Sequence, residues 1–140
     1  MNSSKPSSFS FDGDSAEVEV YYTTYDTDHE GFELAREIRY APATHNIGPE
    51  DWIAYDFGFG GTVDLSDLPG ECSIGVLLSY LYARLQGGRS DDELGYDGTE
   101  HRSVSIGDLI VVDGSAYLVD KGHSFRHVGK IDNLRSGSAK

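Results

Sequence analysis

Alternating apolar and polar side chains predict strands near both ends of the chain. Residues 17–24 alternate charged and apolar side chains and then run into two tyrosines, which is typical of a half-buried strand. Residues 103–112 and 116–120 predict a second pair of strands. Asp113 and Gly114 lie between them and favour a two-residue hairpin, because both positions of its turn need a positive φ.

Weaker patterns complete the expected elements. A partial spacing of apolar residues by three and four predicts a helix over 28–39, and the aromatic segment 52–59 predicts another strand. Gly107 and Asp108 interrupt the apolar pattern that precedes the hairpin and indicate a bulge or kink. A short last strand is expected over 124–128.

The clearest helical pattern spans residues 73–86. Its apolar residues recur every three or four positions and form one stripe, which suits a helix packed on a core or on a second copy. Ser73 is expected to cap the first turn, and Arg84 suits the negative end of the helix dipole. Gly87 is expected to end the helix in the left-handed conformation.

Together these elements predict an α+β domain with a mainly antiparallel sheet, one long amphipathic helix over about 73–86 and a C-terminal β-hairpin over about 103–120. We expect residues 16–128 to form a single domain, because a chain of 140 residues is long enough for one hydrophobic core. The serine-rich residues 1–15 are expected to be a disordered arm, and residues 129–140 a flexible basic tail.

Charge is distributed unevenly along this acidic chain. The 24 acidic and 11 basic residues give a formal net charge of −13, and residues 1–120 contain 23 of the acids but only 6 of the bases. Such a composition is expected in a halophilic organism with a molar-salt cytoplasm, where a Debye length of ~3 Å screens self-repulsion. The alternative is an acidic surface that mimics the phosphates of DNA, as an antirestriction-type protein would.

Contact between this protein and nucleic acid is expected only at its C-terminal end. The acidic body would repel phosphates, so we expect no direct nucleic-acid binding there. A weak contact could come from the bases of the last twenty residues, which are Lys121, Arg126, Lys130, Arg135 and Lys140.

Neither export nor membrane insertion is predicted. Residues 1–10 are polar and lack the apolar stretch of a secretory signal. The longest uncharged apolar run, 74–83, is about half of the ~20 residues that a membrane span needs. The only cysteine, Cys72, excludes an internal disulfide and a zinc cage built from cysteines. We therefore expect a soluble, cytoplasmic protein.

One acidic segment resembles a calcium loop. Asp26, Asp28 and Glu30 alternate along the chain, Gly31 follows, and Glu37 comes six residues later. Four carboxylates in this pattern could surround one hard cation. However, an EF-hand needs a helix before the loop, and the preceding segment predicts a strand. The other interpretation is an acidic helix N-terminus stabilised by the helix dipole, with no metal or other cofactor.

The remaining reactive residues do not form a complete catalytic signature. His123 and His127 are four residues apart near Asp120, but on a strand that spacing corresponds to roughly 13 Å, too far for one metal ion. The serines lack a G-x-S-x-G elbow, and Cys72 has no identifiable histidine partner. We therefore expect a protein that is not an enzyme.

Two C-terminal stretches carry a resemblance to a known family. They are R-S-V-S-I-G-D-L-I-V-V-D-G at 102–114 and A-Y-L-V-D-K-G-H-S-F at 116–125, preceded by W-I-A-Y-D-F-G-F-G-G-T-V-D at 52–64. Over about residues 52–128 the chain resembles the YodL-like family of small domains found on plasmids and integrative elements. This chain lacks the family's Phe-Asn after the helix and its usual His-Pro in the linker. The resemblance implies an accessory protein of mobile DNA and transfers no catalytic residue.

Candidate binding residues lie around the C-terminal hairpin: Arg102, Ser103, Ser105, Asp108, Tyr117 and Asp120. Turn hydrogen bonds and a binding site would both explain these polar side chains.

The sequence as a whole predicts a non-enzymatic accessory protein of a mobile genetic element in a halophilic archaeon, acting through a protein partner. The acidic DNA mimic and a calcium-binding module are the alternatives, and the oligomeric state is left open.

Overall fold

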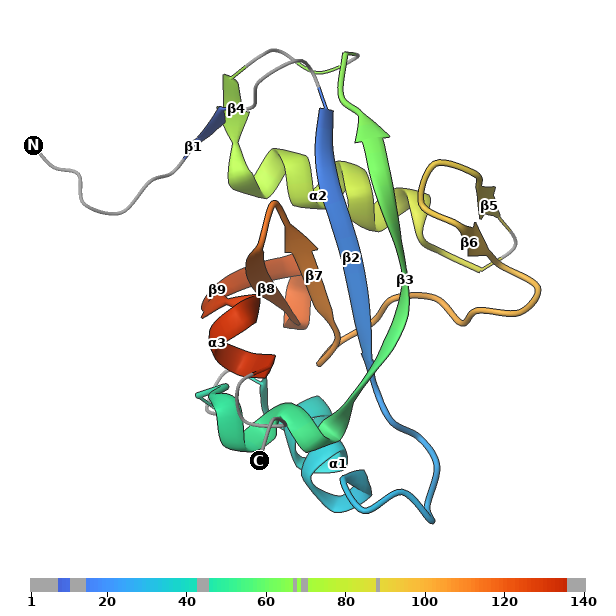
Figure 1. Ribbon diagram of the computed structural model, residues 1–140, viewed down its shortest axis with the longest axis vertical. Helices are drawn as coiled ribbons and strands as arrows, with labels where there is room; N and C mark the ends of the chain where they lie inside the picture. The colour runs from blue at the N-terminus through green and yellow to red at the C-terminus, as the bar shows by residue number, and fades with distance from the viewer. Residues whose placement is uncertain are drawn as a thin grey trace, which may run out of the picture.

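A five-stranded antiparallel sheet organises the molecule, with the strand order β3-β2-β7-β8-β9 (Figure 1). This computed structural model describes residues 8–10, 15–42, 46–66, 68, 71–87 and 89–135. The strands of the sheet are β2 (Ser15–Thr23), β3 (Tyr55–Asp64), β7 (Leu109–Val112), β8 (Ser115–Asp120) and β9 (Ser124–Lys130). The predicted class, α+β with a mainly antiparallel sheet, is confirmed.

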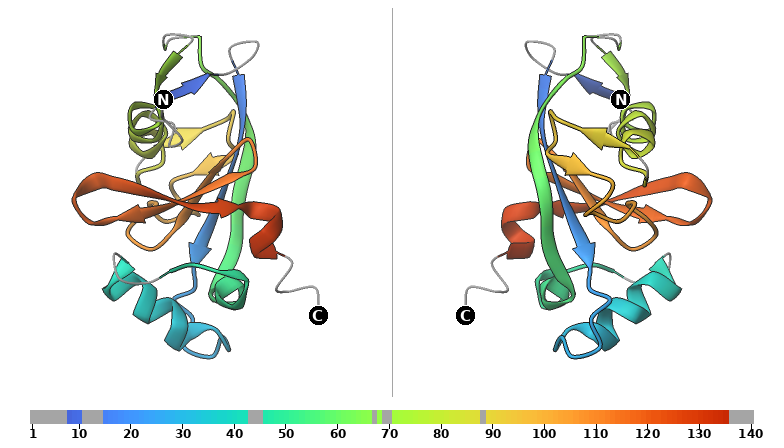
Figure 2. Two further views of the ribbon diagram at one scale, coloured as in Figure 1. Left: turned by 90° about the vertical axis from the view of Figure 1, so that its left-hand side faces the viewer. Right: turned by 90° about the vertical axis from the view of Figure 1, so that its right-hand side faces the viewer.

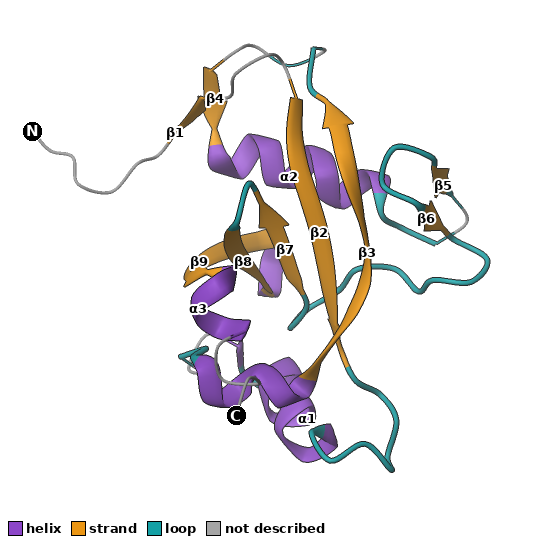
Figure 3. Ribbon diagram, in the orientation of Figure 1, coloured by secondary structure: helices purple, strands orange, loops and turns teal. Residues whose placement is uncertain are grey.

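Helices and short strands surround the sheet (Figure 3). The helical elements are α1 (Phe32–Tyr40), the 3₁₀ segment η3 (Pro49–Ala54), α2 (Ile74–Arg84), the 3₁₀ turn η4 (Lys121–His123) and α3 (Ile131–Arg135). The short strands form two small antiparallel pairs, β1 (Ser8–Ser10) with β4 (Glu71–Ser73) and β5 (Ser90–Asp91) with β6 (Tyr96–Asp97). Among the described residues, no helix is long and apolar enough to cross a membrane.

Apolar side chains cover both faces of the sheet. One core joins α2 to one face, and a second core joins α1, η3 and α3 to the other. Figure 2 shows α2 and α3 on opposite sides of the β2–β3 pair. Ile110 belongs to the first core, whereas its neighbour Leu109 belongs to the second. All four residues of β7 are therefore buried, which explains why this strand reads as a continuous apolar run rather than an alternating one.

The apolar stripe on α2 packs within the same chain. Leu77, Leu78 and Leu81 are buried, and so is Leu85 just after the helix. Ser73 caps the first turn as predicted, because its hydroxyl accepts a hydrogen bond of 3.1 Å from the backbone N–H of Val76. The stripe therefore forms part of the chain's own core.

The prediction that Gly87 ends this helix in the left-handed conformation is wrong. Leu85 follows the last turn with a negative φ of −110°, and Gly87 does not adopt a positive φ. The buried side chain of Leu85 ends the helix through packing, and the Gly87 N–H donates to the Ser103 hydroxyl at 2.6 Å. Arg84 lies in the last turn as expected, but its guanidinium is held by two carboxylates, Asp91 at 2.6 Å and Glu93 at 2.7 Å.

The C-terminal hairpin forms as predicted. Asp113 and Gly114 have φ values of 47° and 86°, as a two-residue hairpin turn requires. Gly107 has a φ of 96° in the turn before β7, which delays the start of that strand to Leu109. The last strand, β9, was also predicted and continues two residues further than expected.

Two element boundaries differ from the sequence expectation for local reasons. The segment 52–59 was expected to be all strand, but η3 occupies it up to Ala54, because Pro49 favours a helical start and the Asp51 carboxylate accepts from the Gly48 N–H at 2.8 Å. The helix expected from residue 28 begins only at Phe32.

Both expected flexible ends contain ordered elements. Ser8–Ser10 forms β1, inside the arm that was expected to be disordered, and pairs with β4. Inside the expected tail, α3 follows β9 and buries Ile131 and Leu134 against the second core. The remainder of these two segments, 1–7, 11–14 and 136–140, lies outside the described residues.

The polar loop after α2 also packs closely on the sheet. A Cβ atom at Gly61 would overlap with the backbone carbonyl oxygen of Glu93, so β3 and this loop approach each other too closely for a side chain. We expect Gly61→Ala to destabilise the fold by about 1–3 kcal/mol, the usual cost of overpacking. Chemical denaturation would measure it, and Gly75→Ala, where a Cβ would make only an ordinary contact of 3.9 Å with the Ser73 hydroxyl, should cost far less. Equal effects at the two glycines would contradict the close approach.

Candidate functional site

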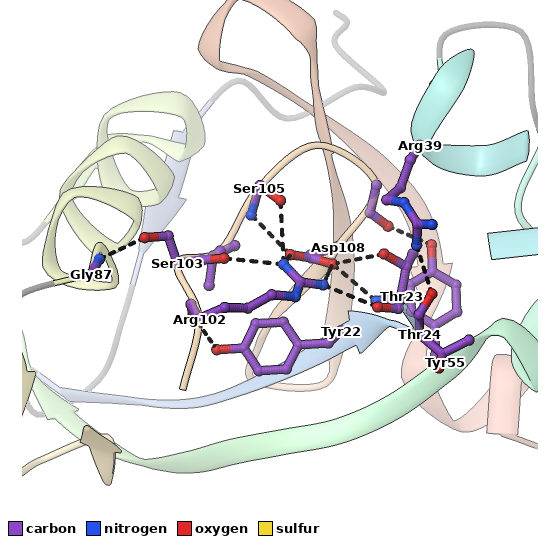
Figure 4. Close-up of polar contacts among 12 residues, drawn as sticks. Tyr22, Thr23, Thr24, Arg39, Tyr55, Gly87, Arg102, Ser103, Ser105 and Asp108 are labelled. Carbon is purple, nitrogen blue, oxygen red and sulfur yellow. Dashed lines mark hydrogen bonds and ion pairs between the residues drawn. The ribbon is translucent and has the colours of Figure 1, made fainter. Parts of the chain in front are cut away.

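Arg102 and Asp108 form a two-pronged ion pair at the centre of the candidate site (Figure 4). The two terminal nitrogens of Arg102 lie 2.8 Å from the two carboxylate oxygens of Asp108. Asp108 directly precedes β7 and its side chain is completely buried, whereas about a third of the Arg102 side chain is exposed. Planar guanidinium and carboxylate groups match best in this geometry.

Backbone and hydroxyl donors complete the shell of Asp108. Its carboxylate accepts from the N–H of Thr23 at 2.9 Å, from the Thr23 hydroxyl at 3.2 Å and from the N–H of Ser105 at 2.8 Å. Arg102 also donates to the Thr23 carbonyl at 3.0 Å. The pair therefore ties the end of β2 to the 102–108 loop.

The protonation of this cluster follows from burial and pairing. Burial raises the pKa of Asp108, although Arg102 and the backbone donors oppose that shift. Burial by itself would lower the pKa of Arg102, but the hydrogen bonds and charge of Asp108 outweigh it and the pKa is raised. Arg102 thus keeps its positive charge, and its guanidinium is committed to the buried carboxylate.

Two tyrosines fix the backbone around the pair. The Tyr22 hydroxyl donates to the Arg102 carbonyl at 2.7 Å, and the Tyr55 hydroxyl donates to the Gly107 carbonyl at 2.7 Å. Burial raises the pKa of both phenols, so each remains a protonated hydrogen-bond donor. The Tyr22 ring also stacks below the Arg102 guanidinium, 4.3 Å from ring centroid to Cζ.

The other predicted binding residues are held by separate contacts. The Ser103 hydroxyl accepts from the N–H of Gly87, Tyr117 on β8 packs on the ring of His127 at 5.2 Å, and Asp120 accepts from the N–H of Lys121 at 2.7 Å. Within the part of the chain that the structure describes, no hydrogen bond, ion pair or ring contact joins Tyr117 or Asp120 to the Arg102–Asp108 pair. The structure thus joins Arg102, Ser105 and Asp108 directly, and Ser103 through the backbone.

The acidic calcium-loop pattern does not form a metal centre. Asp26, Asp28, Glu30 and Glu37 all lie in described segments, and no group of three or more metal-ligating side chains occurs among the described residues. The Asp26 carboxylate instead accepts from the N–H of Asp28 at 2.9 Å, a local turn before α1.

An open basin beside the ion pair was not predicted. It has a volume of about 500 Å³ and is lined by Tyr25, Arg36, Arg39, Tyr40, Tyr82, Ser105 and Ile106. We call it the arginine–tyrosine basin. The guanidinium groups of Arg39 and Arg102 both lie over the Tyr25 ring, at 3.9 Å and 4.6 Å from its centroid.

A signal for the basin was present in the sequence. Arg36 and Arg39 are separated by one helical turn and followed by Tyr40, in a region of the chain that is very poor in bases. What the sequence could not show is that this helix face lies beside Tyr25 and the 105–106 loop.

Comparison with known proteins does not assign a family. No protein-family model matches the chain, and neither the curated proteins nor the solved structures contain a match.

Proposed function

We propose that the protein is a non-enzymatic interaction module that binds a protein partner. The observation that carries this proposal is the exposure of aromatic side chains beside the basin. Tyr25 is 55% exposed and Tyr40 is 82% exposed, so two large rings that line the basin are open to solvent. Tyrosine and arginine are both among the residues enriched where proteins bind one another.

The polar groups of the site support binding rather than chemistry. The Asp108 carboxylate and the two terminal nitrogens of Arg102 are engaged with each other and with neighbouring backbone groups, so neither group is free to act on a substrate. Among the described side chains, no histidine is hydrogen bonded to a hydroxyl or a thiol, as a nucleophile and its base would be.

No specific observation favours either of the two alternative functions, a DNA mimic or a calcium-binding module. A DNA mimic needs its carboxylates in rows at the spacing of duplex phosphates, whereas exposed acids come from α1, β3, the β5–β6 loop and the β7–β8 turn, which lie on several sides of the molecule (Figure 1). A calcium module needs the four carboxylates of the acidic loop to converge, and no such group forms among the described residues.

We also propose that the protein acts in a mobile genetic element of a halophilic archaeon. The resemblance of residues 52–128 to the YodL-like family supports the first part of this proposal. The net charge of −13 supports the second, because dense carboxylates keep a protein in solution where salt screens their repulsion.

Affinity capture tests the partner proposal directly. The immobilised chain is incubated with haloarchaeal lysate in molar KCl, with and without nuclease, beside a variant carrying Tyr40→Ser. The Tyr40 side chain is 82% exposed, so the variant should remain folded. We expect a defined protein to be retained by the wild type after nuclease treatment and lost with the variant. Recovery of nucleic acid alone would overturn the proposal.

The halophilic origin predicts a strong dependence of stability on salt. Raising KCl from ~0.1 M to molar shortens the Debye length from ~10 Å to ~3 Å and weakens repulsion among the carboxylates. We expect the melting temperature to rise by at least ~5 °C, equivalent to roughly 1–2 kcal/mol for a domain of this size.

Sucrose at matched osmolality provides the control for the salt experiment, because it favours the compact state without screening charge. A melting temperature that is indifferent to KCl, or that responds equally to sucrose, would contradict the halophilic interpretation.

A further inference from the structure

We propose that the arginine–tyrosine basin binds an acidic segment of the partner protein, with carboxylates on Arg39 and Arg36 and an apolar side chain between the tyrosines. This inference rests on the proposed function as an interaction module and specifies the chemistry of the partner.

The charge of the basin contrasts with the rest of the chain. Residues 15–120 contain five arginines and no lysine. Two of these arginines line the basin; a third, Arg102, lies over its Tyr25 wall, but its charge is neutralised by Asp108. Lys121 adds a further positive charge, with its Nζ atom 6.0 Å from the centroid of the Tyr40 ring. An acidic ligand that most of this surface would repel is therefore attracted here.

Arg39 provides the main anchor for a carboxylate. One of its terminal nitrogens donates to the Thr24 carbonyl at 2.7 Å, and its guanidinium stacks on Tyr25, so the group is held in one orientation. Arg39 forms no ion pair with any described residue, in contrast to Arg102. Its remaining N–H groups can donate to an incoming carboxylate without first breaking an internal salt bridge.

Arg36 provides a second, weaker contact. It lies one turn earlier on α1 and pairs with Glu33 at 2.6 Å, but both side chains are about two-thirds exposed. An exposed pair of this kind contributes little stability, so Arg36 can exchange Glu33 for a partner carboxylate at small cost.

The position of the arginines on α1 favours a carboxylate over a phosphate. Arg39 lies in the last turn of α1 (Phe32–Tyr40) and Arg36 at its middle. The negative end of the helix dipole disfavours a doubly charged phosphate more than a singly charged carboxylate. Phosphate sites more often use a helix N-terminus. The apolar wall, made of Tyr25, Tyr40 and Ile106, fits an aliphatic or aromatic side chain within the acidic segment.

Fluorescence anisotropy with defined peptides tests this binding mode. The probes are labelled octapeptides of Glu and Asp that carry one Leu or Phe at each successive position, and matched peptides with Gln and Asn in place of the acids. Measurements use the lowest KCl concentration at which circular dichroism shows the chain folded. We expect the acidic set to bind and the amide set to bind at least tenfold more weakly.

Three arginine variants separate the basin from general charge attraction. Arg39→Gln should weaken binding at least tenfold, and Arg36→Gln, which changes an exposed side chain and preserves the fold, about threefold. Arg89→Gln removes the same charge from an exposed residue next to β5, outside the basin, and should change affinity less than twofold.

Several results would overturn the inference. They are equal weakening by all three variants, equal binding of acidic and amide peptides, absence of binding by every acidic peptide, and tighter binding of inorganic pyrophosphate than of any peptide. Dimerisation that Arg39→Gln abolishes would show instead that the basin's occupant is a second copy of this chain.

Failure of the inference can be distinguished from failure of the proposed function. If affinity capture retains the same partner on wild type and Arg39→Gln, the interaction module stands and the basin is not its binding site. If wild type retains no protein at all, the proposed function itself is wrong.

Discussion

Replacing Asp108 by asparagine should lower the free energy of unfolding by about 3 kcal/mol, the lower end of the range for breaking a buried ion pair. The Asp108 carboxylate is completely buried and receives both terminal nitrogens of Arg102. An asparagine has nearly the same size but presents an NH₂ group to at least one donor. Arg102 would lose its counter-charge, and the N–H of Thr23 or Ser105 would lose its acceptor. The cost stays at the lower end because Arg102 is partly exposed and can turn toward water.

Chemical denaturation at neutral pH measures this effect, with Asp92→Asn as the matched control. Asp92 is exposed in the β5–β6 loop, so the same chemical change should alter stability by less than about 0.5 kcal/mol. Similar small effects at both positions would mean that the Arg102–Asp108 pair is dispensable for folding. The interpretation of this pair as a structural link between β2 and the 102–108 loop would then be wrong.

Shortening Leu81 to alanine should destabilise the protein by about 2–5 kcal/mol, the usual range for a cavity left in a core. Leu81 lies in the middle of α2, is fully buried and belongs to the core between this helix and the sheet. The core around Leu81 also contains side chains of β2, β3 and β7, which the sheet holds in place, so the core cannot collapse freely into the gap.

Val76→Ala is the control on the same helix. Val76 is 50% exposed, so removing its methyl groups should cost much less than the change at Leu81. The destabilisation at Leu81 should also be independent of protein concentration, because its neighbours belong to the same chain. A concentration-dependent loss would show that the stripe on α2 is a contact between two copies.

The local pattern of apolar, polar and turn residues predicted several of the regular elements correctly. The alternating residues of β2, the stripe of α2 and the Asp113–Gly114 turn all formed as predicted, because each depends on side chains close together in the sequence. The failures have a common cause. The loop after α2 looked polar, yet it buries Leu94 and Tyr96 beside β3. The C-terminal tail looked flexible, yet its Ile131 and Leu134 reach the second core.

The candidate site was predictable only in part. Arg102, Ser105 and Asp108 are near one another in the sequence and were all candidate binding residues, with turn hydrogen bonds as the other explanation for Ser105 and Asp108. The groups that bury and orient them come from the end of β2, about eighty residues earlier, as the bonds from Tyr22 and Thr23 show. No local pattern identifies such long-range partners.

What the sequence by itself determined is the class of the fold, the principal strands and helix, and the acidic character of the surface. These properties follow from periodicity, turn residues and charge, which act over a few positions. Only the tertiary structure decided that Asp108 is buried on Arg102 and that Arg36 and Arg39 of α1 line a basin with Tyr25. The reason is physical: burial and electrostatic environment depend on which distant segments the sheet brings together, and two cores on opposite faces set that arrangement here.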